Sequence, residues 1–552
     1  MNNIDHVLQT PQIDANSRQE PTKEKRSTHS EQWTVKRYLA YGVGHVLNDM
    51  CASTWFSYLL VFLREVVHLS PVDSAIVMFS GQIADGVATP LVGIISDHTE
   101  GLPSFGLEKR KFCIALGAIC VLLCFFFVFA TCAPCWFYTQ PSRLVLVTYY
   151  SVTASLFNCG WAAVQVSHMA MAPELSEDNN VRCILSSTRY AFTILSNVLV
   201  FGVFYLLLHA EHPYNVPNAS KFTHLAYVSL CAGGICILFF LIGTTERTAG
   251  DNISDPSDQN SDDLSSQHEF DTNTTQPMLA LEQLCVKPGT SLRCGYRETS
   301  IHQKSIKMKW SDWFYLPMFY EVGLAYMCTR LVVNMTQVYI PLYLIVTLHM
   351  DATSIALVPL LVYLSGFLAT ITIRPLNQKL GRAGSFNVGS TLIVIALTLS
   401  YFLGPASAKW IYLVSVILGI GNSVLMVCSV CLEGDLVVCL EGDLVGTNVE
   451  SGAFVYGAMS FTDKVSNGIA ILLIQNKREE TEYFPHKDSD LLRKVFCILP
   501  SLAAILGAAA VIHMKYWNKP SSGKKQASDQ VLESEEQNLR LKKEESRAYG
   551  SL

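Results

Sequence analysis

Four charged side chains stand inside long apolar segments of this sequence: Asp49, Asp85, Arg330 and Lys464. A charge at the centre of a bilayer costs about 2.5–3.5 kcal/mol, so such a residue faces a cavity or a partner of opposite sign. These residue types therefore indicate binding of charged groups within a membrane. For Asp85 and Lys464 two interpretations stay open, a site that couples transport to an ion and a structural ion pair.

Arg330 belongs to a polar stripe. Tyr326, Arg330, Asn334 and Gln337 follow helical spacing on an otherwise apolar segment, and we expect the stripe to face a central cavity. A guanidinium group grips a carboxylate with two hydrogen bonds. The alternative is that Arg330 pairs with Glu321 or with an acid of the first half.

Asp49 is suited to an amine or a hydroxyl group, or to a hydrogen bond between helices. His45 and His168 are candidates for a proton relay. The alternative for each histidine is a neutral polar side chain bonded across helices.

Asp97 and the basic cluster Lys109, Arg110 and Lys111 indicate a cytosolic gate or a latch between helices. The sequence has no phosphate-binding loop, catalytic triad or metal-ligand pattern, which argues against an enzyme and predicts no metal or cofactor. The net charge of −6 is carried mostly by tails and loops and gives no reason to expect a nucleic-acid partner.

The elements that hold these residues are apolar and long. Charged residues are only 16% of the 552 residues and mean hydropathy is +0.29, which favours a membrane protein. The expected spans of the first half are 38–63, 72–96, 112–131, 144–172, 188–209 and 222–243. Those of the second half are 316–346, 355–373, 386–403, 410–431, 452–474 and 495–516.

The sequence therefore predicts an all-α membrane protein with twelve transmembrane helices in two six-helix halves. The expected organisation is a disordered tail (1–37), a first half (38–247), a cytosolic linker (248–312), a second half (313–518) and a disordered tail (519–552).

An internal comparison supports the two halves. Gly81 precedes Pro90 by nine positions, and Gly366 precedes Pro375 by nine positions, each pair within the second span of its half. In this register Asp85 corresponds to Thr370, so the membrane acid is present in one half only.

Basic residues in the short loops place both termini in the cytosol. The stretch from 477 to 494 disagrees, because it is basic on the predicted far side. Asn218 then lies in a far-side loop as a candidate glycosylation site. Cys132 and Cys135, in the sequence CAPC, also fall on that side, where a disulfide is one of two open alternatives.

Two further features need an account. CLEGDLVV at 431–438 is followed by the near-copy CLEGDLVG, and we expect one copy to bulge into the next loop unless the repeat is a sequence artefact. The chain ends on residues from Tyr549 to Leu552, a pattern typical of sorting signals that adaptor proteins read.

Four motifs carry a resemblance to a known family. YGVGHVLND, DGVATPLVGIISD, PELSEDNNVRCILSSTRYAF and SGAFVYGAMSFTDK resemble, in order and spacing, the sodium-coupled sugar symporters of the melibiose-carrier branch of the major facilitator superfamily. YGVGHVLNDMCAS, TRLVVNMTQVY and SGAFVYGAMSF resemble more closely a lysosomal and melanosomal branch of that superfamily needed for cysteine import. The resemblance implies the superfamily fold.

The resemblance also implies roles for single residues. Asp49 matches the substrate-binding acid of the sugar carriers, and Arg189 matches an arginine along their sugar path. Asp85 matches the first acid of their cation site, and Lys464 matches the lysine near it.

Two departures argue against sodium coupling and against sugar as the substrate. Thr89 stands where the carriers have a second acid, and Gln165 stands where they have one in the fourth helix. A sodium ion prefers several oxygen ligands with compensating charge, whereas one carboxylate facing a lysine remains.

We therefore expect an alternating-access transporter that moves cysteine or a similar small thiol amino acid into the lumen of a lysosome or melanosome. Such a substrate is a zwitterion and needs one partner of each sign, so we expect Arg330 to hold its carboxylate and Asp49 its ammonium group. Its expected partners are the small-molecule substrate, the lipid bilayer and sorting adaptors. The alternatives are a cation-coupled sugar or lipid symporter and a membrane scaffold or trafficking factor that transports nothing.

Overall fold

The structure, a computed structural model, describes residues 34–99, 101–102, 106–129, 132–176, 179–209, 219–245, 310–442 and 449–517. Its first half begins with α1 (Val35–Gly42), η1 (Val43–His45), α2 (Val46–Val61) and η2 (Phe62–Val66), which together form one span. It continues with α3 (Pro71–His98), α4 (Lys109–Phe129), α5 (Ala133–Phe137), α6 (Arg143–Leu175), α7 (Asn179–His209) and α8 (Ala219–Gly243).

The second half starts with η4 (Trp310–Tyr315), α10 (Pro317–Leu342) and η5 (Tyr343–Thr347). It continues with α11 (Ser354–Tyr401), η6 (Pro405–Trp410), α12 (Ile411–Gly442), α13 (Val449–Thr481) and α14 (Pro485–Trp517).

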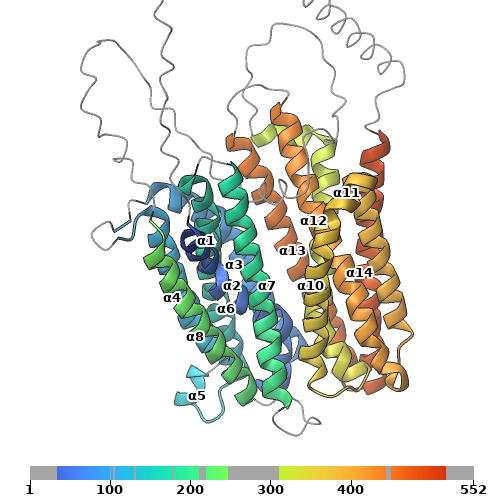
Figure 1. Cartoon of the computed structure of the whole chain (residues 1–552). Helices are drawn as coiled ribbons and strands as arrows, with labels where there is room; N and C mark the ends of the chain where they lie inside the picture. Colours follow the sequence, from blue (N-terminus) through green and yellow to red (C-terminus); the bar gives the residue numbers. More distant parts are fainter. Residues whose placement is uncertain are drawn as a thin grey trace, which may run out of the picture.

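Among the described residues, nine helices are long and apolar enough to cross a membrane by length and composition. The other three spans are α6, α13 and the start of α11, where Ser354–Thr370 is a shorter apolar helix. The expected all-α fold of twelve spans is therefore confirmed. Figure 1 shows α1 to α8 on one side of the molecule and α10 to α14 on the other.

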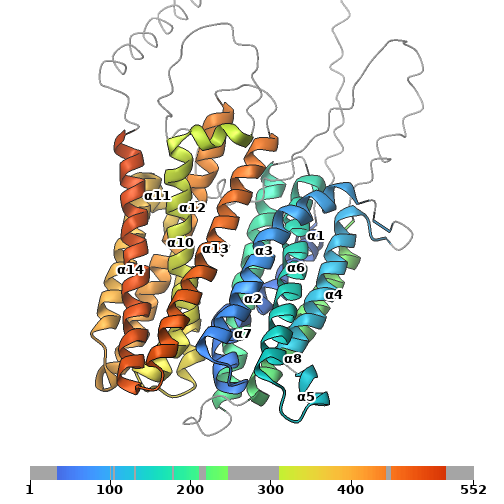
Figure 2. The same ribbon diagram turned by 180° about the vertical axis from the view of Figure 1, so that it is seen from behind.

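Both described ends of the chain, the start of α1 and the end of α14, lie toward the upper end in Figure 1, which we call the terminal end. The short helix α5 lies at the other, far end. On the reverse side, Figure 2 shows α13 of the second half beside α3 of the first, and residues of these two helices are in contact.

The two repeated glycines occupy matching positions in the halves. A Cβ on Gly81 would lie 2.6 Å from Nδ2 of Asn158 in α6, and a Cβ on Gly366 would lie 2.4 Å from Oγ of Ser423 in α12. Each glycine thus lets the second helix of its half pack closely on the fourth. This shared packing explains why both glycines stand at the same place in the repeat.

The second half differs from expectation at two places. The expected loop after 373 is shortened to a tight turn at Gly381, where φ is +72° and ψ is 169° and the two helices of α11 (Ser354–Tyr401) meet. Glycine adopts this left-handed conformation without the steric cost that a Cβ brings. The helix α12 continues through the first octad to Gly442, so the first copy does not bulge, and residues 443–446 lie outside the described part.

The basic stretch at the far end carries its own counter-charges. Nε and Nη2 of Arg478 donate to Asp488 at 2.9 and 3.1 Å, both side chains being buried. Lys477 pairs with Glu480, and Lys494 lies 2.6 Å from Asp490. These bases are paired within the same stretch, but orientation follows Lys and Arg rather than net charge, so the stretch still counts against the predicted orientation.

Contacts at the far end also join the two halves. Arg64 of η2 forms an ion pair with Glu482, just beyond α13. A carboxylate oxygen of Glu479 accepts from the backbone N–H of Val72 at 3.1 Å and from the hydroxyl of Ser70 at 3.3 Å. The loop between the first two spans is therefore tied to the end of α13.

Gly419 of α12 sets the closest approach between α11 and α12. A Cβ there would lie 2.1 Å from the carbonyl oxygen of Val362, a backbone atom that cannot swing away. We expect Gly419→Ala to lower the melting temperature of the purified protein by several degrees, since overpacking costs about 1–3 kcal/mol. Gly202→Ala is the matched control, because that helical glycine has open space where its Cβ would stand. Equal melting temperatures for the two variants would contradict the packing account.

Candidate functional site

A cavity of about 410 Å³ lies between the two halves. It is lined by residues of η1, α2, α6 and α7 from the first half and of α10, α11 and α12 from the second. The candidate site residues among its lining are His45, Asp49, Gln165, Arg189, Arg330, Asn334 and Gln337. Six positions of the expected binding and relay sets and one of the coupling set are thus brought together around one space.

The acid of the first half is held by two neighbours. Nδ1 of His45 lies 2.9 Å from one oxygen of Asp49, and the hydroxyl of Thr193 donates to the other oxygen at 2.7 Å. His45 reaches the cavity through a 3₁₀ turn, where a Cβ on Gly44 would lie 2.5 Å from the ring of Phe240. The contacts with His45 and Thr193 thus orient the carboxylate of Asp49.

Arg189 of α7 brings a positive charge to the same cavity. Its Nε is buried and has no hydrogen-bond partner among the described residues. A buried donor without a partner costs free energy that a ligand can restore. Arg189 is therefore a charged cavity group with a donor that an acceptor on a ligand can satisfy.

Arg330 has a protein partner. Its Nε donates to Asp463 of α13 at 2.8 Å, and Nδ2 of Asn467 donates to the other oxygen of Asp463 at 2.6 Å. The alternative pairing of Arg330 with Glu321 is wrong, because Glu321 lies 2.7 Å from Nδ1 of His513.

Asp463 did not enter the sequence predictions, although it precedes Lys464 in the motif that carries the family resemblance. On a helix, neighbouring residues point about 100° apart, so Asp463 faces α10 while Lys464 faces α3. The sequence feature that could have identified Asp463 is its position next to Lys464, which puts two opposite charges side by side in the middle of an expected span.

The rest of the polar stripe on α10 divides into two groups. Asn334 lines the cavity and its Nδ2 lies 3.5 Å from Asp463, and Nε2 of Gln337 donates to Ser57 of α2 at 3.1 Å. Tyr326 is buried and lies outside the cavity lining.

Asp85 of α3 and Lys464 of α13 form an ion pair across the two halves. Thr89 donates to the carbonyl oxygen of Asp85 at 2.8 Å and accepts from Nζ of Lys464 at 3.4 Å. The ammonium also lies 5.3 Å from the centre of the Trp161 ring. The two charges thus face each other across the halves, and neither lines the cavity.

His168 lies behind the cavity and is fully buried. Its Nε2 lies 2.9 Å from the carbonyl oxygen of Tyr41, and its ring stacks on the Tyr41 ring at 4.4 Å. The ring of His45 lies 5.7 Å away, with an unpartnered nitrogen on each ring among the described residues. These contacts bond His168 across helices.

The basic cluster at the terminal end binds oxygens of neighbouring helices. Arg110 donates to Oγ of Ser96 at 2.7 Å, and Nζ of Lys111 donates to the carbonyl oxygen of Thr244 at 3.0 Å. Lys109 begins α4. The side chain of Asp97 is outside the described part, as are the glycosylation candidate Asn218 and the sorting residues Tyr549 and Leu552.

Comparisons with known proteins agree with this architecture. The family model described as MFS/sugar transport protein matches residues 40–270, and that of the Major Facilitator Superfamily matches residues 183–437. A solved structure of a mutant of the nucleoside transporter NupG is 12% identical, covers 87% of this chain and 99% of its own, and superposes with a TM-score of 0.55, which shows the shared fold.

Sequence relatives narrow the family. The chain is 34% identical over 453 residues to major facilitator superfamily domain-containing protein 12 of Homo sapiens, an alignment that covers 79% of this chain and 84% of the relative. The horse protein of the same name, from Equus caballus, is 35% identical over 450 residues. An uncharacterized symporter of Synechocystis is 29% identical over 192 residues, 34% of each chain. This chain is therefore a multi-pass membrane transporter of the major facilitator superfamily, in the family of major facilitator superfamily domain-containing protein 12.

Proposed function

We propose that this transporter carries a small zwitterionic thiol, cysteine or a close analogue, from the cytosol into the lumen of a lysosome or melanosome. The proposal rests on one observation: Asp49 and Arg189 line the same cavity, and Nε of Arg189 has no hydrogen-bond partner among the described residues. A carboxylate on Arg189 and an ammonium group on Asp49 complement both charges of an amino acid. The proposed location rests on the family resemblance alone.

We give Arg330 a role other than the binding of the substrate carboxylate that we expected from the sequence. Because Asp463 already neutralises it at 2.8 Å, a substrate carboxylate at Arg330 has to compete with a carboxylate that is in place. For Arg189, the described residues include no such competitor. We assign the substrate carboxylate to Arg189 and give Arg330, with Asn334 and Gln337, the role of shaping the polar wall opposite.

The coupling ion is the point that separates this proposal from a sodium symporter. Asp85 has its charge balanced by Lys464, and Thr89 offers a neutral oxygen in place of a second acid. A sodium ion there has to displace the ammonium of Lys464. We therefore propose that Asp85 and Lys464 latch the halves together and that transport needs no sodium.

The contacts between the halves at the far end fit one step of an alternating-access transport cycle. The ties of Glu479 to Val72 and of Arg64 to Glu482 hold the halves together at the predicted lumenal end. We propose that they close that exit while the cavity loads from the cytosol.

We expect Arg189→Ala to reduce uptake of radiolabelled cysteine into liposomes containing the purified protein by about tenfold to a hundredfold. The loss reflects a charged hydrogen bond worth about 1.5–3 kcal/mol. Lys494→Ala is the control, since this lysine pairs with Asp490 and the two side chains are 51% and 54% exposed. Such surface pairs contribute about 0–1 kcal/mol.

Uptake by the Arg189→Ala protein at the wild-type rate would contradict the assignment of this arginine. Absence of uptake by the wild-type protein for every amino acid tested would instead favour a scaffold or trafficking factor.

We expect Asp85→Asn to lower the melting temperature more than the double variant Asp85→Asn/Lys464→Met does. Removing one partner leaves a buried charge uncompensated at a cost of about 3–5 kcal/mol, whereas replacing both partners is often close to neutral. Uptake by the wild-type protein should be equal in sodium and in choline buffers. Sodium-dependent uptake that Asp85→Asn abolishes would overturn the latch and support a cation-coupled symporter.

A further inference from the structure

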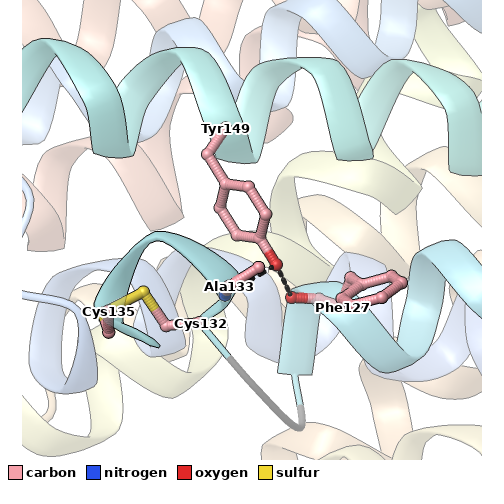
Figure 3. The surroundings of a disulfide bond; sticks show 5 residues. All are labelled: Phe127, Cys132, Ala133, Cys135 and Tyr149. Carbon is pink, nitrogen blue, oxygen red and sulfur yellow. Dashed lines mark hydrogen bonds between the residues drawn. A yellow bond between two sulfur atoms is a disulfide. The ribbon is translucent and has the colours of Figure 1, made fainter. Parts of the chain in front are cut away.

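A disulfide closes the sequence CAPC in the connection between α4 and α6. Cys132 and Cys135 are three positions apart and bonded to each other. Figure 3 shows the bond beside Tyr149 of α6, and Figure 1 places α5, which begins directly after Cys132, at the far end of the molecule. None of the charges of the cavity or of the latch takes part in this loop.

The disulfide contributes little to the stability of the fold. Stabilisation by a disulfide grows with the length of chain that it closes, and here it closes a loop with only two residues between the cysteines. Hydrogen bonds already hold that loop. The hydroxyl of Tyr149 donates to the carbonyl oxygen of Phe127 at 2.8 Å and accepts from the N–H of Ala133 at 3.4 Å (Figure 3). The bond from Ala133 ties the loop to α6 by a contact that does not depend on the disulfide.

The bond is also open to attack. Cys135 is exposed, whereas Cys132 is half-buried, so an incoming group reaches the sulfur of Cys135 first. Trp136 and Phe137, which follow it, are 65% and 81% exposed. Aromatic side chains of this kind anchor at the surface of a bilayer. They hold the disulfide at the edge of the membrane, where small water-soluble molecules reach it more readily than a folded protein domain does.

We propose that the Cys132–Cys135 disulfide is a site of thiol–disulfide exchange with small-molecule thiols and disulfides on the far side of the membrane. A small-molecule thiolate attacks Sγ of Cys135 and forms a mixed disulfide. The bond to Cys132 breaks, and its electron pair leaves on Sγ of Cys132, which takes up a proton.

A second small-molecule thiolate then attacks the small-molecule sulfur of the mixed disulfide. This step releases a small disulfide and leaves Cys135 as a thiolate, which takes up the second proton. Two small thiols are thereby oxidised to one disulfide, and the protein disulfide is reduced to two thiols. The reverse sequence, with a small-molecule disulfide as the oxidant, restores the bond. This chemistry is independent of the substrate proposed for the cavity.

The test is reduction of the folded wild-type protein, in detergent at neutral pH, by reduced glutathione at millimolar concentration. Free thiols are blocked beforehand, and peptide mass spectrometry follows Cys132 and Cys135. The free cysteines among the described residues lie within helices that cross the membrane. We expect reduction in the folded protein at a rate within about tenfold of that in the denatured protein, because exchange is governed by access of the thiolate to sulfur. A bond that stays oxidised until the protein is denatured overturns the proposal.

Two matched variants identify the attacked sulfur. In Cys132→Ser, oxidised glutathione should form a mixed disulfide at Cys135 that persists, since no second cysteine resolves it. In Cys135→Ser, the half-buried Cys132 should react at least several-fold more slowly. Equal rates, or faster reaction at Cys132, contradict the assignment of Cys135. The rates are read without any transport assay, so failure here is distinct from failure of the proposed function.

Discussion

The ion pair between Asp85 and Lys464 is the interaction on which the arrangement of the two halves depends. Both charges are buried in helices that cross the membrane, so each is tolerated only while the other is near. Because one lies on α3 and the other on α13, this requirement holds a helix of the first half against a helix of the second. A Cβ on Gly468 of α13 would lie 2.6 Å from the ring of Phe79, so close backbone packing accompanies the charge pair.

The helix α13 carries two opposite charges that serve two neighbours. Lys464 pairs with Asp85 on α3, and Asp463 pairs with Arg330 on α10. The four charges cancel, which suits a site without bulk water. The cavity lining also holds the carboxylate of Asp49, which His45 and Thr193 contact, and the guanidinium of Arg189. Of the two ion pairs, Asp85–Lys464 joins the two halves, whereas Asp463–Arg330 lies within the second half.

The fold was predictable because its cause is local. A bilayer requires about 20 consecutive apolar residues for each span, and this requirement is visible in the chain without any tertiary contact. The polar stripe on α10 was predictable for the same reason, since helical spacing alone puts Arg330 and Asn334 on one face. The turn at Gly381 was predicted too long, because a polar stretch with a glycine has the same composition whether it forms a loop or the ends of two helices that meet at a tight turn.

It was harder to predict which residue each charged side chain pairs with than to predict which charges lie in the membrane spans. The pairing of Asp85 with Lys464 was among the stated alternatives because each was a charge in an apolar span. The partner of Arg330 was missed, because the choice between Glu321 and Asp463 depends on the rotation of α13 about its axis, which only packing determines. The unpartnered Nε of Arg189 likewise required knowledge of which acids the other helices had already neutralised. Sequence patterns list the charges, whereas the structure shows which remain available.

The most direct test of the account is competition for cysteine uptake in liposomes by analogues that each lack one charged group. Cysteamine has the thiol and the ammonium group, 3-mercaptopropionate has the thiol and the carboxylate, and unlabelled cysteine has all three. We predict strong competition by cysteine and at least tenfold weaker competition by either analogue, because each forfeits a charged hydrogen bond worth about 1.5–3 kcal/mol. Equal competition by either analogue would contradict recognition of a zwitterion by Asp49 and Arg189.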